Sequence, residues 1–448
     1  MPTITPVNVG HTAVLLSQNR RRIDNQLPPE RLIQIAKENP VVDTFLKLAV
    51  IPTPTIRPGH PKELEMRQNM SLVRDITDQL FKGLHPEVTS YVDDYGSLII
   101  KVPGSEEHKN KQPLMFMGHL DVVPADLDEP TKQVYPTLIN HSTKEGIKEY
   151  IASDGTTTLG ADDKSLVAII WDVVRRTINE PHVPYEIVLA IDEEEDGASL
   201  VNLKTSDFKS KHIIVADYDR AFQITFGCAS FVIIKIDVDG LKGGHSGDDN
   251  QEMMVSATDI LKELHDGIGN RVIKYFSDFA APLLSKNIYE YEIARSASNK
   301  IPTEGHLYLS LRSNRQDLED EEIKRIENEV KQIEQKHRSR EQALSIQIKI
   351  DKQCPPWNGD PKSLLVKLLT QAANEIGHKE VKIAPEHGAT QVNNLVGKKN
   401  QNGEDFIPVI VGVDSEHWHS TKENVSPRSM REVSNWLCKF VQIYSSTN

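Results

Sequence analysis

Histidine and acidic residues follow several strand-like, apolar segments of the sequence. In MGHLDVVP, His119 and Asp121 end a buried strand two residues apart, so both side chains leave the same face of the chain. The histidine can bind a metal ion while the aspartate accepts its other ring N–H and fixes the tautomer. A hydrogen-bonded structural pair would give the same short motif, so this motif alone does not decide between the two.

Two more motifs carry neighbouring aspartates. LGADDKS places Asp162 and Asp163 after Gly160 and before a helix, where backbone amides at the helix N-terminus can support carboxylates. A helix cap needs only one aspartate, which leaves the second unexplained by capping. VADYD supplies Asp217 and Asp219 at the end of a strand. In an α/β sheet, ligands gather at the carboxyl ends of the strands, so these aspartates are candidates for one site.

The segment VLAIDEEEDGASL runs from a strand into five consecutive acids, Asp192 to Asp196, whose mutual repulsion opposes full ionisation. Most such charge runs are solvated turns. EHWHSTKENV adds His417 and His419 in a loop beyond another strand. Imidazole and carboxylate ligands without cysteine suit catalytic zinc or other oxophilic divalent metals. Two histidines and three carboxylates could hold two metal ions if one carboxylate bridges them, and the bound metal would offset the repulsion.

Short apolar strands alternate with helical patterns around these motifs, which predicts an α/β layered sheet. Four segments rich in Ile, Val, Leu and Met have the pattern of strands buried on both faces: 97–102, 114–120, 185–191 and 212–217. A helix with apolar residues nearly all round is expected over 164–178. After about residue 352 the α/β pattern returns, with a strand over 406–413 between helices over 361–377 and 431–444.

The segment 229–351 has a different pattern of strand, helix, two strands, helix and strand, which is the ferredoxin-like split unit. In its second helix Ile323, Ile326, Val330 and Ile333 form one apolar stripe, which predicts packing on its own sheet. We therefore predict an N-terminal extension, an α/β domain in two parts and an inserted α+β domain. The boundaries are 1–28 for the extension, 29–228 and 352–448 for the α/β domain, and 229–351 for the insertion.

Composition limits the class of protein. With 448 residues, 38% hydrophobic content and no apolar run near the roughly 18 residues that span a bilayer, the chain is expected to be globular and not membrane-embedded. A formal charge of −13 argues against general binding of nucleic acid. Three distant cysteines argue against disulfides and thiolate zinc sites. Because the first residues do not form a secretory signal, we expect a cytoplasmic protein.

Five motifs together resemble the cocatalytic-zinc peptidase superfamily, which includes peptidase T, carboxypeptidase G, the aminoacylases and the cytosolic dipeptidases. GHLDVVP, LGADDK, the E-E-x-G form of the acidic run, GLKGGHSG and H-S-x-x-E-x-V occur in the family's order and approximate spacing. LGADDK, FLKLAVIPTPT and DDYGSLIIKVPG look most like peptidase T, whereas DYDRAFQITFGCAS and GLKGGHSGDD look closer to the aminoacyl-histidine dipeptidases. The resemblance implies a zinc-exopeptidase-type layered mixed sheet with an inserted ferredoxin-like lid and dimerisation domain.

The resemblance also implies a set of metal ligands, in which Asp162 bridges two divalent ions: His119, Asp162, Glu195, Asp217 and His419. The ions would be zinc, with cobalt and manganese as the other candidates. Glu194 would be the general base on a metal-bridging water, Asp121 would orient His119, and His245 of the lid would donate to the oxyanion. Two further residues of the lid match positions that touch the substrate: Asn299 and Arg312.

The acidic run can be aligned with the family pattern in two ways. Counting E-E-x-G back from Gly197 makes Glu194 the base and Glu195 the ligand. Counting D-E-E from the left makes Glu193 and Glu194 the pair instead. We prefer the first alignment because the glycine spacing fits.

The sequence therefore predicts a two-metal hydrolase that cleaves the amide bond of short peptides, either a peptidase T-like aminopeptidase (tripeptidase) or a dipeptidase. The EHGATQ stretch departs from the R-G-G-T-D-G form of peptidase T, which leaves both substrate lengths open. One alternative is an amidohydrolase acting on N-acyl or N-carbamoyl amino acids, because the metal motifs are shared. A non-catalytic metal-binding protein is an alternative of another class. The resemblance further implies a homodimer formed through the lid.

Overall fold

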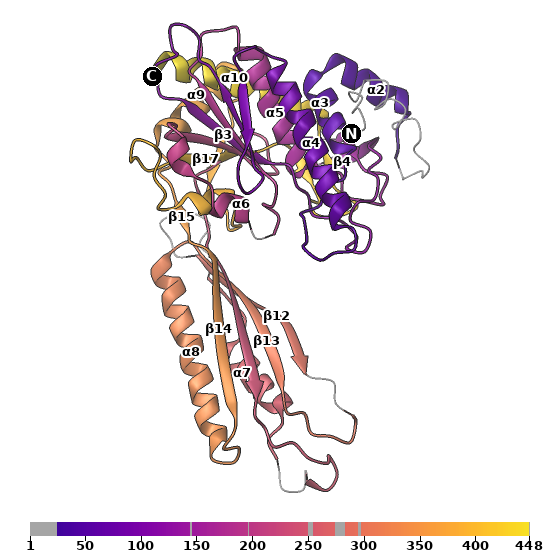
Figure 1. Ribbon diagram of the computed structural model, residues 1–448, viewed down its shortest axis with the longest axis vertical. Coiled ribbons are helices and arrows are strands. Elements are labelled where there is room, and N and C mark those ends of the chain that lie inside the picture. Colours follow the sequence, from indigo (N-terminus) through magenta and orange to yellow (C-terminus); the bar gives the residue numbers. More distant parts are fainter. Residues whose placement is uncertain are drawn as a thin grey trace. The chain divides into compact units, whose positions relative to one another are not determined.

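The structure is a computed structural model that describes residues 25–143, 146–195, 197–249, 254–273, 283–293 and 297–447 (Figure 1). Residues 1–24 of the predicted extension lie outside the described residues. The chain divides into two compact units. The first contains residues up to Phe226 together with Gly359–Ala384 and the chain from Gly397 onward, and the second contains Gly227–Asn358 and Pro385–Val396. The segment Pro385–Val396, which we predicted within the α/β domain, thus belongs to the second unit.

The first unit is built on an eight-stranded mixed sheet. In spatial order its strands are β1 (Thr89–Val92), β2 (Leu98–Val102), β6 (Tyr185–Ala190), β3 (Leu114–His119), β7 (His212–Ala216), β17 (Ile407–Val411), β8 (Gln223–Thr225) and β16 (Lys382–Ala384). The central strands β6, β3, β7 and β17 run parallel to one another, so their carboxyl ends lie at one edge of the sheet. The strands predicted from apolar runs are all present, and β3, β6 and β7 are buried along their whole length.

The described residues of the first unit also form helices. They are α2 (Pro29–Glu38), α3 (Pro40–Ala49), α4 (Glu63–Lys82), α5 (Ala161–Thr177), the short α6 (Ala198–Val201), α9 (Leu364–Glu375) and α10 (Pro427–Thr447). Helix α5 contacts β3 and β7 on one side and α3, α4 and α10 on the others. This position explains why its sequence is apolar nearly all round, as predicted. Among the described residues, none of the helices combines the length and apolar character needed to cross a membrane.

A small second sheet in the first unit has the order β18 (Ser415–Glu416), β19 (Asn424–Val425), β5 (Gly146–Ala152) and β4 (Thr137–Thr143). Strand β19 pairs with β5 through Asn424 opposite Ala152. The loop between β18 and β19, which carries His419, is therefore anchored at both ends by paired strands. This sheet was not predicted from the sequence.

The second unit is the predicted α+β insertion. Its strands and helices are β9 (Gly227–Cys228), β10 (Phe231–Asp239), α7 (Ala257–Ile268), β11 (Arg271–Ile273), β12 (Leu284–Ile293), β13 (Gly305–Ser313), α8 (Gln316–Arg338), β14 (Ser345–Cys354) and β15 (Trp357–Asn358). The main sheet of this unit has the order β11-β12-β13-β10-β14, and α7 and α8 pack on it (Figure 1). The stripe of Ile323, Ile326, Val330 and Ile333 is buried in the core of this unit, as predicted. The split β-α-β-β-α-β order is present, with β11 as an additional short strand.

Candidate metal centre

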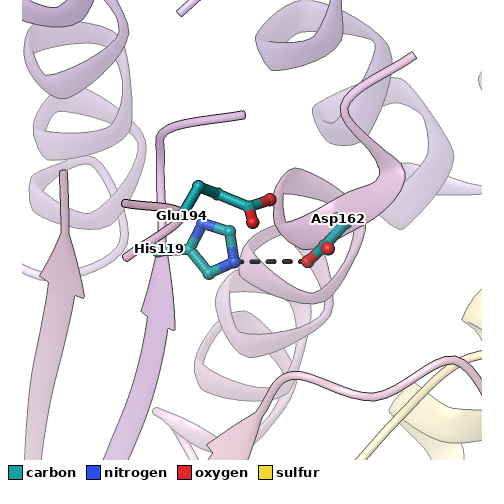
Figure 2. Close-up of side chains that lie close together, drawn as sticks. All are labelled: His119, Asp162 and Glu194. Atoms are coloured by element: carbon teal, nitrogen blue, oxygen red, sulfur yellow. Dashed lines mark hydrogen bonds and ion pairs between the residues drawn. The ribbon is translucent and has the colours of Figure 1, made fainter. Parts of the chain in front are cut away.

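Four side chains from different elements meet at the carboxyl edge of the main sheet. His119 is the last residue of β3, Glu194 lies in the turn after β6, Asp162 stands at the start of α5, and His419 lies in the loop between β18 and β19. The carboxylate of Asp162 points at His119, and Glu194 lies beside them (Figure 2). The ligand atoms of His119, Asp162 and Glu194 lie within 4.8 Å of one another, a spacing that a shared metal ion could occupy.

Asp162 occupies the middle of this cluster. Its Oδ1 atom lies 3.2 Å from Nε2 of His119, and its Oδ2 atom lies 3.1 Å from Nε2 of His419. The same Nε2 atom of His419 is 3.1 Å from Oε2 of Glu194. Since the two oxygens of one carboxylate face two different histidines, Asp162 is placed as a carboxylate that bridges two cations would be. The preference for Asp162 over Asp163 as the central residue agrees with this geometry.

Asp121 fixes both His119 and the start of the acidic run. Its carboxylate lies 3.3 Å from Nδ1 of His119, and its backbone carbonyl lies 3.1 Å from the same nitrogen. The backbone N–H groups of Glu193 and Glu194 donate to Oδ1 and Oδ2 of Asp121, each at 3.2 Å. The hydroxyl of Thr55 donates to Oδ2 at 2.7 Å. The buried carboxylate of Asp121 thus determines which acidic residues turn toward the cluster.

The geometry of this turn bears on the two alignments of the acidic run. Glu195, which we expected to bind metal, forms an ion pair with Arg57, and its side chain is 35% exposed. Glu194, which we expected to act as the base, is the carboxylate beside Asp162 and His419, and its side chain is only 6% exposed. The physical reason is that Asp121 binds the amides of Glu193 and Glu194, so the chain has turned away by Glu195. The geometry favours the other alignment, in which Glu193 and Glu194 form the pair.

Asp217 and Glu193 lie at the same edge. Asp217 follows β7 directly and is buried, with 7% of its surface exposed. Burial, followed by repulsion from Asp217, raises the pKa of Glu193 well above its usual range. One carboxylate oxygen of Glu193 is 4.0 Å from Nε2 of His119. Asp219, the aspartate we did not select, has a side chain that is 43% exposed and pairs with Arg220 at 3.8 Å.

The electrostatics of the cluster show an excess of negative charge. Burial and repulsion from Asp162 raise the pKa of Glu194 to about 7. Hydrogen bonds to Asp162 and Glu194 raise the pKa of His419 to about 10. The buried Oε1 of Glu194 and Oδ1 of Asp163 have no hydrogen-bond partner among the residues that the structure describes. Buried carboxylates with open acceptor sites, which raise the pKa of the imidazole beside them, are suited to divalent cations, because a bound cation would supply positive charge in place of that proton. The residues present therefore fit a metal centre.

Comparisons with known proteins agree with this geometry. The profile of peptidase family M20/M25/M40 matches residues 115–443, which is most of the chain and includes all the clustered side chains. The chain belongs to peptidase family M20/M25/M40. This membership confirms the resemblance inferred from the five motifs.

Curated relatives of this M20/M25/M40 family member are peptidases. It is similar to the cytosol non-specific dipeptidase of Escherichia coli (strain K12), with 25% identity over 307 residues that cover 62% of this chain and 55% of the relative. It is also similar to peptidase T of Halothermothrix orenii, with 26% identity over 227 residues that cover 45% of this chain and 54% of the relative. The chain thus spans about half the length of the curated relatives it matches.

Solved structures show the same fold. The aminopeptidase PepT from Bacillus cereus has a TM-score of 0.71 and 19% identity, covering 91% of this chain and 98% of that chain. A tripeptidase from Staphylococcus aureus has a TM-score of 0.72 and 19% identity with the same coverage. The predicted fold class, a layered mixed sheet with an inserted α+β domain, is confirmed for this M20/M25/M40 family member.

Sequence reasoning missed two buried positions beside the clustered side chains, Glu423 and Gly118. Glu423, which is 1% exposed, accepts backbone N–H groups from Leu159, Gly160 and Asp162 at 2.7, 2.9 and 3.0 Å. Its signal was present as the glutamate of H-S-x-x-E-x-V, to which we had assigned no role. Gly118 is a second such position, because a Cβ atom there would lie 2.6 Å from the Asp163 carboxylate that accepts the His119 amide.

The remaining predicted site residues belong to the second unit. His245 and Asn299 line one cavity of about 540 Å³, and the backbone N–H of Ser246 donates to the Asn299 carbonyl at 2.9 Å. Arg312 places its guanidinium 4.2 Å from the centre of the Phe231 ring, and burial lowers its pKa. The structure thus brings His245 and Asn299 together, whereas Arg312 packs on an aromatic ring elsewhere in that unit's sheet.

Proposed function

We propose that this family member is a two-metal exopeptidase that hydrolyses the amide bond of dipeptides or tripeptides. The observation that carries the proposal is the position of Asp162, whose two carboxylate oxygens face His119 and His419 separately. Similarity to a dipeptidase and to peptidase T supports short peptides as the substrate class.

The proposed ligand sets share Asp162. His119, Asp162 and Asp217 would hold one divalent ion, and Asp162, Glu194 and His419 would hold the other. Zinc is the metal we favour because nitrogen and carboxylate ligands suit it, and cobalt and manganese share that preference. When bound, the two ions would lower the pKa of a water molecule and polarise the carbonyl of the scissile amide.

Glu193 takes the role of general base in this proposal, in place of Glu194. It lies next to Glu194 in the turn set by Asp121, and its carboxylate is 4.0 Å from the ring of His119. Glu193 would accept a proton from the attacking water and deliver that proton to the amine nitrogen as the C–N bond breaks. Nearby cations would lower its raised pKa and keep it ionised at neutral pH. Asp121 would hold His119 in the tautomer that leaves Nε2 free for metal.

His245, Asn299 and Arg312 of the second unit remain proposed substrate-contacting residues, with His245 as a donor to the oxyanion. A homodimer through this unit is also part of the proposal. It is supported by exposed apolar side chains on β11 and β12, where Val272 is 56% and Tyr289 is 49% exposed. Light scattering that shows a monomer at working concentrations would remove the dimer from the proposal. A cytoplasmic location is proposed because one relative is named a cytosol dipeptidase.

The test uses the full chain, freed of metal with a chelator and reloaded with zinc, cobalt or manganese. A panel of dipeptides, tripeptides, N-acetyl amino acids and N-carbamoyl amino acids is analysed by mass spectrometry, which also shows the end that is trimmed. Metal-dependent release of one amino acid from peptides is the expected result. Cleavage confined to the acylated amino acids would make the protein an amidohydrolase. Stoichiometric metal binding without any hydrolysis would make it a non-catalytic metal-binding protein.

A further inference from the structure

The buried side-chain carboxylate of Glu423 contacts backbone N–H groups of the segment that carries Asp162, and not the Asp162 side chain. Its Oε2 atom accepts the N–H groups of Leu159 and Gly160, and its Oε1 atom accepts the N–H of Asp162. All three donors belong to the short segment that presents the Asp162 carboxylate. A carboxylate that receives several amide N–H groups is held more firmly than one with a single neutral partner.

The backbone around Gly160 is shaped to bind an anion. Gly160 has φ of 76° and ψ of 32°, a left-handed conformation that directs successive N–H groups toward one point. Asp162 has non-helical φ and ψ of −83° and 106°, so the regular turns of α5 begin after it. Such a cluster of amides at a helix start ordinarily receives a phosphate or another anion. Here the anion is Glu423 of the same chain.

Glu423 also connects this segment with the loop that carries the second histidine. Its backbone N–H donates to the carbonyl of Ser420, the residue after His419, at 3.1 Å. The next residue, Asn424, starts β19 and is fixed by pairing with β5. The side chain of Glu423 therefore connects the loop that carries His419 with the segment that carries Asp162. Nε2 of His419 and Oδ2 of Asp162 lie 3.1 Å apart.

We propose that Glu423 is a positioning residue that sets the orientation of the Asp162 carboxylate relative to His419 and thereby the affinity of the centre for metal. This inference rests on the proposed two-metal centre. Glu423 itself does not contact the ligand atoms, so it acts through Asp162. Partners that orient metal ligands typically contribute about 10-fold to 100-fold in metal affinity, and Glu423 makes three such contacts to one segment.

The test is the nearly isosteric substitution Glu423→Gln in the full chain. The carbonyl oxygen of glutamine can still accept hydrogen bonds from the N–H groups of Leu159 and Gly160. Its NH₂ group, in the place of Oε1, cannot accept a hydrogen bond from the N–H of Asp162. Binding of Co²⁺ alone is followed by its visible absorption in competition with a chelator. We expect a loss of about 10-fold to 100-fold in Co²⁺ affinity, and an altered cobalt spectrum. In the metal-free variant, hydrogen exchange at the Asp162 amide is expected to become faster.

Glu186→Gln is the matched control. Glu186 is a buried carboxylate of the same unit that accepts the backbone N–H groups of Lys209 and Ser210 at 3.0 and 2.9 Å. It stands near the start of β6, whereas the metal centre lies beyond the other end of that strand. This variant is expected to lose thermal stability while its Co²⁺ affinity stays within about twofold of the wild type, as for a site that does not touch the centre.

The outcomes separate the inference from the proposed function. A wild-type protein that binds no Co²⁺ would contradict the metal centre itself. The positioning role alone would be overturned if the wild type binds Co²⁺ and the folded Glu423→Gln variant binds it with equal affinity. If Glu423→Gln does not fold, Glu423→Asp keeps the charge but is one methylene too short to reach all three amides. Equal Co²⁺ affinity in that variant would likewise overturn the role.

Discussion

Replacing Glu193, Glu194 and Glu195 one at a time by glutamine tests the geometry of the acidic run directly. Glu195 pairs with Arg57, and both side chains are about one third exposed, at 35% and 36%. Exposed ion pairs contribute about 0–1 kcal/mol, so Glu195→Gln should lower kcat/KM by less than about fivefold. Metal content should remain that of the wild type.

The other two substitutions should differ from each other in kind. Glu193→Gln removes the proposed base, which contributes about 10²-fold to 10⁴-fold, or about 3–5 kcal/mol of transition-state stabilisation. The variant should keep its metal because Asp162 and His419 remain in place. Glu194→Gln removes the carboxylate whose Oε2 lies 3.1 Å from Nε2 of His419 and whose Oε1 has no partner within the described part of the chain. This variant should lose metal as well as activity.

The assay combines kcat/KM on one peptide substrate with metal content by atomic absorption after dialysis. Circular dichroism on each variant confirms that the fold is retained. The reasoning would be refuted if Glu195→Gln lost metal while Glu194→Gln kept it, because that result would restore the alignment counted from Gly197. Loss of metal in Glu193→Gln would also refute it, since Glu193 would then be a ligand.

Three further predictions address residues around the centre and in the second unit. Thr55→Val should lower both thermal stability and kcat/KM, because a hydrogen bond to the buried carboxylate of Asp121 is worth about 1.5–3 kcal/mol, and Thr55→Ser should restore both. Chelation should lower the melting temperature measured by calorimetry, since a metal at 100 times its Kd contributes about 2.7 kcal/mol; an unchanged melting temperature would argue against a tightly bound metal. Although burial opposes it, hydrogen bonds from Arg325 and Lys286 lower the pKa of Glu322 to about 2. For the full shift from 4.5, the ionised Glu322 stabilises the folded protein by about 3 kcal/mol. This contribution is present above pH 5 and is lost between about pH 5 and pH 2. The difference in unfolding free energy between the wild type and Glu322→Gln, measured by denaturant titration, should therefore shrink over that range.

The elements that could be predicted from the sequence are those with a strong apolar pattern. The runs that became β3, β6 and β7 are buried on both faces, and their composition shows it. Helix α5 contacts neighbours on all sides, so its all-round apolar pattern was equally informative. The small sheet of β4, β5, β18 and β19 was missed because β4 (TLINHST) is polar, β5 (GIKEYIA) is exposed at its start, and β18 and β19 have two residues each.

The site could be predicted wherever a ligand follows a parallel strand, because such strands end at one edge of the sheet. His119, the acidic run and Asp217 were selected as candidates in this way, and the structure places them at that edge. Glu423 could not be found so, because its contacts are with backbone N–H groups of a segment more than 260 residues away in the sequence. A sequence pattern shows the types and spacing of side chains, whereas the role of Glu423 follows from the hydrogen bonds that it accepts from distant backbone amides.

The geometry of the acidic run favours counting from the end of β6 over counting back from the glycine. The backbone N–H of Gly197 donates to the carbonyl of Asp192 at 2.9 Å, and the N–H of Ser199 donates to the Asp192 carboxylate at 2.9 Å. Asp192, the first residue of the turn, thus accepts the hydrogen bonds that close it. Asp121 accepts hydrogen bonds from the backbone N–H groups of the next two residues, Glu193 and Glu194. The position of Glu194 is thus constrained by Asp192 and Asp121 and not by its distance from Gly197. Counting from Asp192, where the chain leaves β6, therefore identifies the carboxylates that face the centre.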